Sequence, residues 1–74
     1  MIYLLFRQDL RRGGLVLIAP HATFDGVLDQ IEAEREYWEK AGKAVQRNLN
    51  GSLYVKDLHE PIFYYFVSSR TIIK

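Results

Sequence analysis

Few side chains in this sequence could carry out acid–base or nucleophilic chemistry. His21 and Asp25 lie one turn apart if a helix already includes both, and His59 is followed directly by a glutamate. Such residues could hold a metal ion, or a histidine could activate a hydroxyl of Ser68-Ser69. However, a proline precedes His21, the spacing brings none of these loops together, and no phosphate-loop, HExxH or CxxC motif is present. We therefore expect no catalytic residue, metal or cofactor, and a protein that is not an enzyme.

Five acidic side chains form a pattern that favours binding rather than catalysis. They are spaced by four, three, four and three residues, which places them on one face of a helix. Like charges at this spacing destabilise an isolated helix by about 0.2–0.5 kcal/mol per pair, with relief expected from Glu36–Lys40 and Glu39–Lys43 pairs. The pattern is typical of a solvated face, or of a surface that docks onto a basic, often nucleic-acid-binding, partner protein. This acidic helix face consists of Asp25, Asp29, Glu32, Glu36 and Glu39.

Basic side chains flank the acidic segment on both sides, although the net charge is only +1. Together with aromatic residues on strands, they leave nucleic-acid binding open as an alternative, because single-strand binders combine a basic groove with stacking rings. No RNP1 pattern supports a known RNA-binding sheet. The basic residues that would contact nucleic acid are Arg11, Arg12, Lys40, Lys43 and Arg47.

These residues must be positioned by short elements. The apolar runs 2–6 and 15–19 are separated by RQDLRRGG, which predicts a β-hairpin. A helix follows, with Thr23 as N-cap, Gly42 as the residue after its end, and an apolar stripe of Phe24, Val27, Leu28, Ile31 and Trp38.

Residues 43–51 allow two interpretations. The helix could continue to Gly51, or residues 43–48 could form a strand followed by a three-residue LNG loop with Gly51 in the left-handed conformation. The second register places Val45 opposite Val55 and Arg47 opposite Leu53. We prefer the shorter helix, because a helix of about 26 residues would be near 39 Å long, too long for so small a sheet.

Two further strands, 52–58 and 62–69, are separated by a turn at DLHEP. The element order is therefore ββα(β)ββ: an α+β fold in which one amphipathic helix packs on one face of an antiparallel sheet of four or five strands. Residues 1–74 form a single domain.

One helix covers only one face of such a sheet. The other face is either an ordinary share of exposed apolar area, a face covered by residues 43–50, an interface with a second copy or a partner protein, or a surface on which bases stack. The alternation of side chains predicts that Ile2, Leu4 and Phe6 face the helix together with Leu53 and Val55. In the strand 62–69 both faces are apolar, so the pattern does not decide whether Tyr64 or Tyr65 points outward. Tyrosine and arginine dominate protein-binding hot spots. The predicted open sheet face contains Tyr3, Arg7, Tyr54, Lys56, and Tyr64 or Tyr65.

The chain is short and has no cysteine, so neither a disulfide nor a zinc–thiolate site supports its small core. The N-terminal apolar run is too short for a secretion signal or a membrane span, which predicts a soluble cytoplasmic protein, in the host cytoplasm if phage-encoded. In size and layout the chain is similar to the small proteins with which phages inhibit host defence or transcription machinery, such as anti-CRISPR proteins. The prediction is a non-enzymatic protein-binding inhibitor or regulator of this type. The alternatives are a small nucleic-acid-binding or transcription-regulatory protein, and a homodimeric structural subunit.

Overall fold

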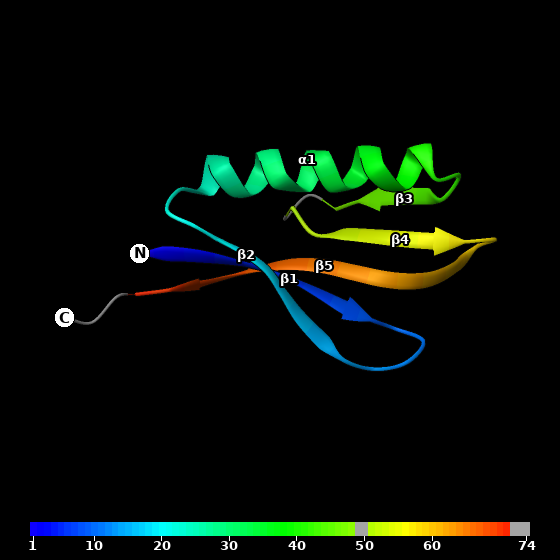
Figure 1. The fold of residues 1–74 in the computed structure, drawn as a ribbon, viewed down its shortest axis with the longest axis horizontal. Coiled ribbons are helices and arrows are strands. Elements are labelled where there is room, and N and C mark those ends of the chain that lie inside the picture. Colours follow the sequence, from blue (N-terminus) through cyan, green and yellow to red (C-terminus); the bar gives the residue numbers. More distant parts are fainter. Residues whose placement is uncertain (49–50, 72–74) are drawn as a thin grey trace.

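The structure is a computed structural model, and it describes residues 1–48 and 51–71. Its elements are β1 (Ile2–Asp9), β2 (Leu15–His21), α1 (Phe24–Lys40), β3 (Ala44–Arg47), β4 (Leu53–Asp57) and β5 (Glu60–Arg70). The five strands form one antiparallel sheet in the order β2-β1-β5-β4-β3, and α1, which connects β2 to β3, packs on it (Figure 1). The predicted α+β class and element order are confirmed.

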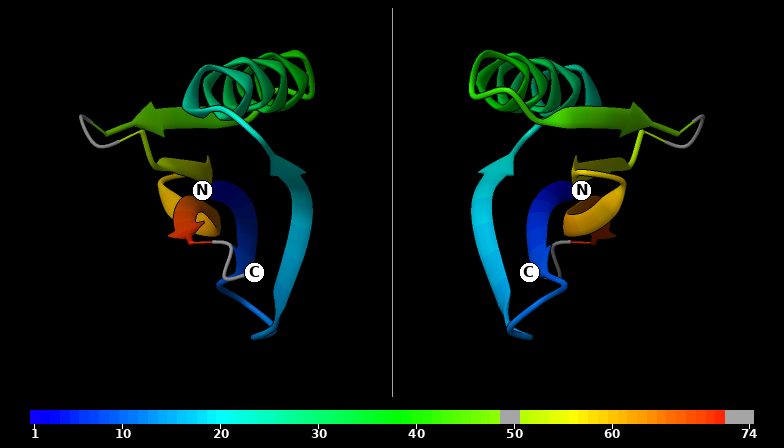
Figure 2. Two further views of the ribbon diagram at one scale, coloured as in Figure 1. Left: turned by 90° about the vertical axis from the view of Figure 1, so that its left-hand side faces the viewer. Right: turned by 90° about the vertical axis from the view of Figure 1, so that its right-hand side faces the viewer.

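The sheet is curved, and the helix lies on its concave side. The end-on views show the strands bending from β3, next to the helix, round to β1 and β2 (Figure 2). Two irregularities in strand pairing accompany this curvature, one between Leu5 and Phe6 on the β1–β2 pair and one between Val55 and Lys56 on the β4–β5 pair. Such bulges bend a strand and increase its twist, which allows a five-stranded sheet to wrap a single helix.

The helix begins and ends where the sequence predicts. The hydroxyl of Thr23 accepts a hydrogen bond from the Gly26 backbone N–H at 3.1 Å, and Gly42 adopts φ +83°, the left-handed conformation that follows a helix. Gly26 also lets the first turn lie close to His21, because a Cβ at this position would come within 3.1 Å of the imidazole Nδ1. The helix is therefore bounded by local chemistry rather than by packing alone.

The short helix and the β3–β4 hairpin are confirmed. Val45 pairs with Val55 and Arg47 pairs with Leu53, the register expected from the sequence. Gly51 has φ +87°, as predicted, while the other two residues of the expected loop, 49 and 50, lie outside the described part of the chain. The β4–β5 turn uses positive φ at both Leu58 and His59, the backbone of a tight two-residue hairpin.

The core is a single cluster between the helix and the concave side of the sheet. Its members are Leu5, Val27, Ile31, Leu53, Val55, Ile62 and Tyr65. Val27 and Ile31 supply the buried part of the helix, as the apolar stripe predicts, whereas Phe24 at the start of the stripe remains 43% exposed and contacts the ring of Tyr3.

The predicted orientation of β1 is wrong. Leu5 is fully buried under the helix, and the neighbouring odd-numbered residues Tyr3 and Arg7 lie on the same side, against Phe24 and over the Phe63 ring respectively. Ile2, Leu4 and Phe6 therefore face outward. The two sets of side chains are both largely apolar, so hydrophobicity could not choose between them. The register with β5, in which Leu5 pairs with Val67, determines the face.

Candidate functional site

A row of four stacked aromatic rings crosses the convex side of the sheet. The ring centroids are 4.6 Å apart for Tyr54–Tyr64, 5.6 Å for Tyr64–Phe66 and 5.4 Å for Phe66–Phe6. We call this row the aromatic ladder. It passes from β4 over the central strand β5 to β1, and the pairing of Tyr54 with Tyr64 and of Phe6 with Phe66 aligns the rings. The sheet register thus builds a continuous aromatic surface from residues that are far apart in sequence.

The angles between neighbouring ring planes indicate how the rings of the ladder pack and which ligands suit them. Neighbouring planes are inclined by 28°, 22° and 21°, and nearly parallel rings at these centroid distances pack as offset stacks. Tyr64 and Phe66 each have a ring neighbour on two sides. Each of these two rings therefore already packs against aromatic neighbours within the protein. Base stacking needs a free ring face, so this arrangement suits contact with a protein surface better than stacking of nucleobases.

The ladder lies within a larger apolar surface. Leu17 pairs with Phe6 and Leu15 pairs with Gln8, which extends the surface onto β2, while a depression of about 400 Å³ lined in part by Gln8, Tyr64 and Phe66 adjoins the ladder. The charged residues that alternation places on this face are basic, Lys56 and Arg70. We define the open sheet face by the following residues: Ile2, Leu4, Phe6, Gln8, Leu15, Leu17, Tyr54, Lys56, Tyr64, Phe66, Ser68 and Arg70.

Sequence reasoning identified part of this face and missed part of it. Tyr54, Lys56 and Tyr64 were expected here, and Tyr64, not Tyr65, is the outward tyrosine. Phe6 and Phe66 were missed, Phe6 because the wholly apolar set of β1 was assigned to the helix side. The signal that could have found them is the antiparallel register, which aligns Phe6 with Phe66 and Tyr54 with Tyr64.

Three residues that were predicted for the open face lie on the helix side instead. Tyr65 is fully buried, while Tyr3 packs against the core and the Arg7 guanidinium lies 5.0 Å from the centre of the Phe63 ring. A cation over an aromatic face is favourable, and the ring also shields the arginine from the core. Arg7 is thus accommodated beneath the helix rather than presented to a partner.

A polar cluster under the helix explains why Tyr65 can be buried. Its hydroxyl accepts a hydrogen bond from Trp38 Nε1 at 2.9 Å and donates one to Glu34 Oε2 at 3.1 Å. Burial raises the pKa of the Tyr65 hydroxyl above its ordinary value of 10.0, which keeps it protonated as a donor. Sequence reasoning missed this cluster, although Glu34 lies three residues after Ile31 and four before Trp38, within the apolar stripe.

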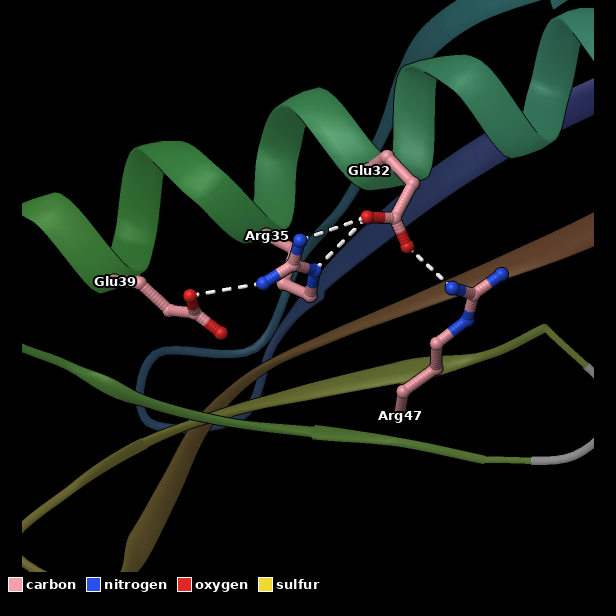
Figure 3. Close-up of polar contacts among 4 residues, drawn as sticks. All are labelled: Glu32, Arg35, Glu39 and Arg47. Atoms are coloured by element: carbon pink, nitrogen blue, oxygen red, sulfur yellow. Dashed lines mark hydrogen bonds and ion pairs between the residues drawn. The ribbon is translucent and has the colours of Figure 1, made fainter.

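The acidic helix face is partly neutralised within the protein. Arg35 contacts Glu32 and Glu39, each at 2.8 Å, and Arg47 of β3 also pairs with Glu32 (Figure 3). Hydrogen bonding from Arg35 is the main reason why the pKa of Glu32 is lowered. Glu39 is paired with Arg35, not with Lys43 as expected. Among the five predicted residues, Asp25, Asp29 and Glu36 form no ion pair with any described residue.

The basic residues expected to contact nucleic acid are mostly paired with acids. Arg11 lies 3.5 Å from both Asp57 and Glu60, Lys43 lies 3.3 Å from Asp57, and Arg47 contacts Glu32. Arg12 and Lys40 form no ion pair within the described ranges. These side chains therefore do not combine into one unpaired basic surface.

The residues considered for chemistry do not converge into a metal site in the described part of the chain, where no group of three potential ligands occurs. His21 Nε2 is buried and has no hydrogen-bond partner among described residues, and His59 lies in the β4–β5 turn.

No helix formed by described residues is long and apolar enough to cross a membrane. The comparisons with known proteins return no match to a family model, a curated protein or a solved structure. The open sheet face and the acidic helix face are therefore the features from which a function can be inferred.

Proposed function

We propose that this protein is a small non-enzymatic binding module that covers a surface of a partner protein with its open sheet face. The observation that carries the proposal is the aromatic ladder, which runs across three strands and is continuous with apolar side chains on β2. Aromatic residues in the centre of an apolar patch supply much of the binding energy in protein interfaces. An inhibitor or regulator of the phage anti-defence type would act in this manner, by occupying a surface that its target needs.

The charge layout is compatible with a protein partner. The ladder's hydroxyl groups, on Tyr54 and Tyr64, and the amide of Gln8 provide polar contacts around apolar rings, an arrangement typical of the rim and core of an interface. Lys56 is held by a 2.7 Å hydrogen bond to Gln46 at the margin of the face. We therefore expect a partner surface that is mainly apolar and carries acceptors or acids at its edge.

The test is a comparison of two variants in the same capture assay. Proteins retained from lysate by the wild-type protein are identified, and the affinity of the purified partner is then measured by calorimetry. Tyr64→Ala combined with Phe66→Ala should weaken binding by roughly tenfold or more, because each is an interior member of the ladder. Circular dichroism must show that the fold is retained.

The matched control changes the acidic helix face at two residues that take no part in the internal ion pairs. Asp29→Asn and Glu36→Gln, combined in one variant, should leave the affinity nearly unchanged. If this control abolishes binding while the ladder variant binds normally, the acidic face is the docking surface and the proposal is wrong. Binding to single-stranded DNA or RNA that weakens steeply with salt would instead support the nucleic-acid alternative.

A further inference from the structure

The two edges of the sheet differ in how well they are protected. The edge strand β3 is short, contains Arg47, and is tied to the helix through the ion pair with Glu32. The other edge strand, β2, has seven residues with the sequence LVLIAPH and no lysine, arginine or acid. Its residues Leu15, Val16 and Leu17 are 57%, 48% and 49% exposed. An uncharged edge with exposed apolar side chains is a site at which another strand can pair.

Only the second half of β2 is protected against pairing with another strand. Pro20 has no backbone N–H to offer, and the pairing irregularity opposite Leu5 and Phe6 leaves Ile18 without a direct partner in β1. Both features discourage a strand from extending over residues 18–21. The segment from Leu15 to Leu17 pairs regularly with β1 on one side and has no such device. It is therefore the accessible part of the edge.

We propose that a second copy of this chain pairs with this segment, so that two β2 strands run antiparallel across a two-fold axis and join the sheets of two molecules. Charge supports this occupant. Antiparallel pairing centred near Val16 or Leu17 brings Arg12, in the turn before β2, toward the end of the partner's β2, which is followed by the first turn of α1 with Asp25. Neither residue forms an ion pair within the described chain, and the two-fold axis forms the Arg12–Asp25 contact twice. Parallel pairing would instead place the two Arg12 side chains together.

The mass of the purified protein, measured by sedimentation over a range of concentrations, tests this interface. The wild-type protein should approach twice the 8.7 kDa chain mass. Leu17→Lys should be monomeric, because two lysines would meet near the axis. Tyr64→Ser, which changes the open sheet face, should remain dimeric. A wild-type monomer at every concentration, or a dimer that survives Leu17→Lys, would overturn the proposal.

Charge reversal tests the antiparallel arrangement separately. Arg12→Glu alone and Asp25→Arg alone should each weaken the dimer, roughly tenfold or more, and the double variant should recover most of the loss. Lys40→Glu, the same change at another base without an ion pair, serves as control and should leave the dimer intact. Failure of the double variant to recover would exclude the Arg12–Asp25 contact.

The two proposals fail independently. Loss of partner capture in the Tyr64→Ala, Phe66→Ala double variant would support the open sheet face as a binding surface even if the wild-type protein is a monomer at every concentration. Leu17→Lys alters the open sheet face as well as the edge, so it tests the dimer alone.

Discussion

Tyr64 and Tyr65 are neighbours in the sequence, and their environments differ completely. Tyr64 stands on the convex side of the sheet between the rings of Tyr54 and Phe66. Tyr65 is fully buried on the concave side, where its hydroxyl bonds to Trp38 and Glu34. The chemistry of the side chain is the same in both cases. The pleat of β5 alone sends one tyrosine to a surface and the other to the core.

The comparison teaches that the aromatic excess of β5 has two separate causes. On the concave side, one large ring fills the space under the helix, and its hydroxyl satisfies groups that would otherwise be buried without partners. On the convex side, stacked rings stabilise one another across strands, and no helix or strand formed by the described residues lies above them. The first arrangement is explained by folding, whereas the second is the basis for the proposed partner surface.

The largest difference in stability between the two sides of β5 is expected when the ring of Tyr64 or of Tyr65 is removed. Tyr65→Ala should reduce the free energy of unfolding by about 3–5 kcal/mol, because it leaves a cavity in the core. A domain of this size has roughly 4–11 kcal/mol in total, so the loss is a large fraction of its stability. Tyr64→Ala should cost about 1–2 kcal/mol, mainly lost stacking. Urea unfolding followed by circular dichroism measures both.

The ratio of the two losses in free energy of unfolding shows whether the two sides of the sheet differ in packing. Equal losses for Tyr64→Ala and Tyr65→Ala would mean that the convex side is as well packed as the core. In that event the ladder would already have a full structural role, and the argument for an external partner would lose its basis.

Removing only the hydroxyl sharpens the comparison. Tyr65→Phe should cost about 1–2 kcal/mol at neutral pH, since Trp38 Nε1 and Glu34 lose a buried partner, whereas Tyr64→Phe should change stability by less than about 0.5 kcal/mol. The folded-state pKa of Tyr65 lies above 10.0, its value in the unfolded chain. The protonated hydroxyl therefore contributes stability below pH 10, and this contribution is lost as the pH rises through the folded pKa.

Alkaline unfolding tests this assignment. The wild-type protein and Tyr64→Phe should both lose stability as the pH is raised above 10, and Tyr65→Phe should show a shallower decline. A decline that is the same in all three proteins would place the relevant ionisation elsewhere.

Much of the fold follows from local signals in the sequence. Thr23 and Gly42 bound the helix through capping chemistry, and the spacing around Gly51 predicts the register of Val45 with Val55, because turns fix hairpin pairing. These features depend on residues close together in the chain. Their physical causes can therefore be read without knowing the rest of the structure.

The faces of β1 and β5 could not be predicted in the same way. Alternation divides each strand into two sets, but in β1 Leu5 and Phe6 are both apolar, and one set must still be assigned to the helix. The choice depends on long-range register and on the Glu34–Tyr65–Trp38 hydrogen bonds, which make it favourable to bury a tyrosine beneath the helix. The aromatic ladder is a consequence of that choice, so its members could be only partly identified from the sequence.

The smallest effect is expected from the exposed ion pairs along the helix and between the helix and β3, and it tests whether burial determines what a polar contact contributes. Glu32 is linked to Arg35 and Arg47, yet these side chains are in contact with water. Glu32→Gln should therefore change stability at neutral pH less than Tyr65→Phe does, and added salt should reduce the effect of Glu32→Gln further.

Because the folded-state pKa of Glu32 is lowered below 4.5, the contribution of this carboxylate to stability is present above pH 4.5 and lost as the pH falls through the folded value. Acid unfolding should accordingly be less steep in Glu32→Gln than in the wild-type protein. Glu36→Gln, at a carboxylate that forms no ion pair with a described residue, should retain the wild-type slope. If Glu32→Gln proves more damaging than Tyr65→Phe, the helix is held on the sheet chiefly by its outer charges, and the contrast between the two sides of β5 would no longer account for the stability of the fold.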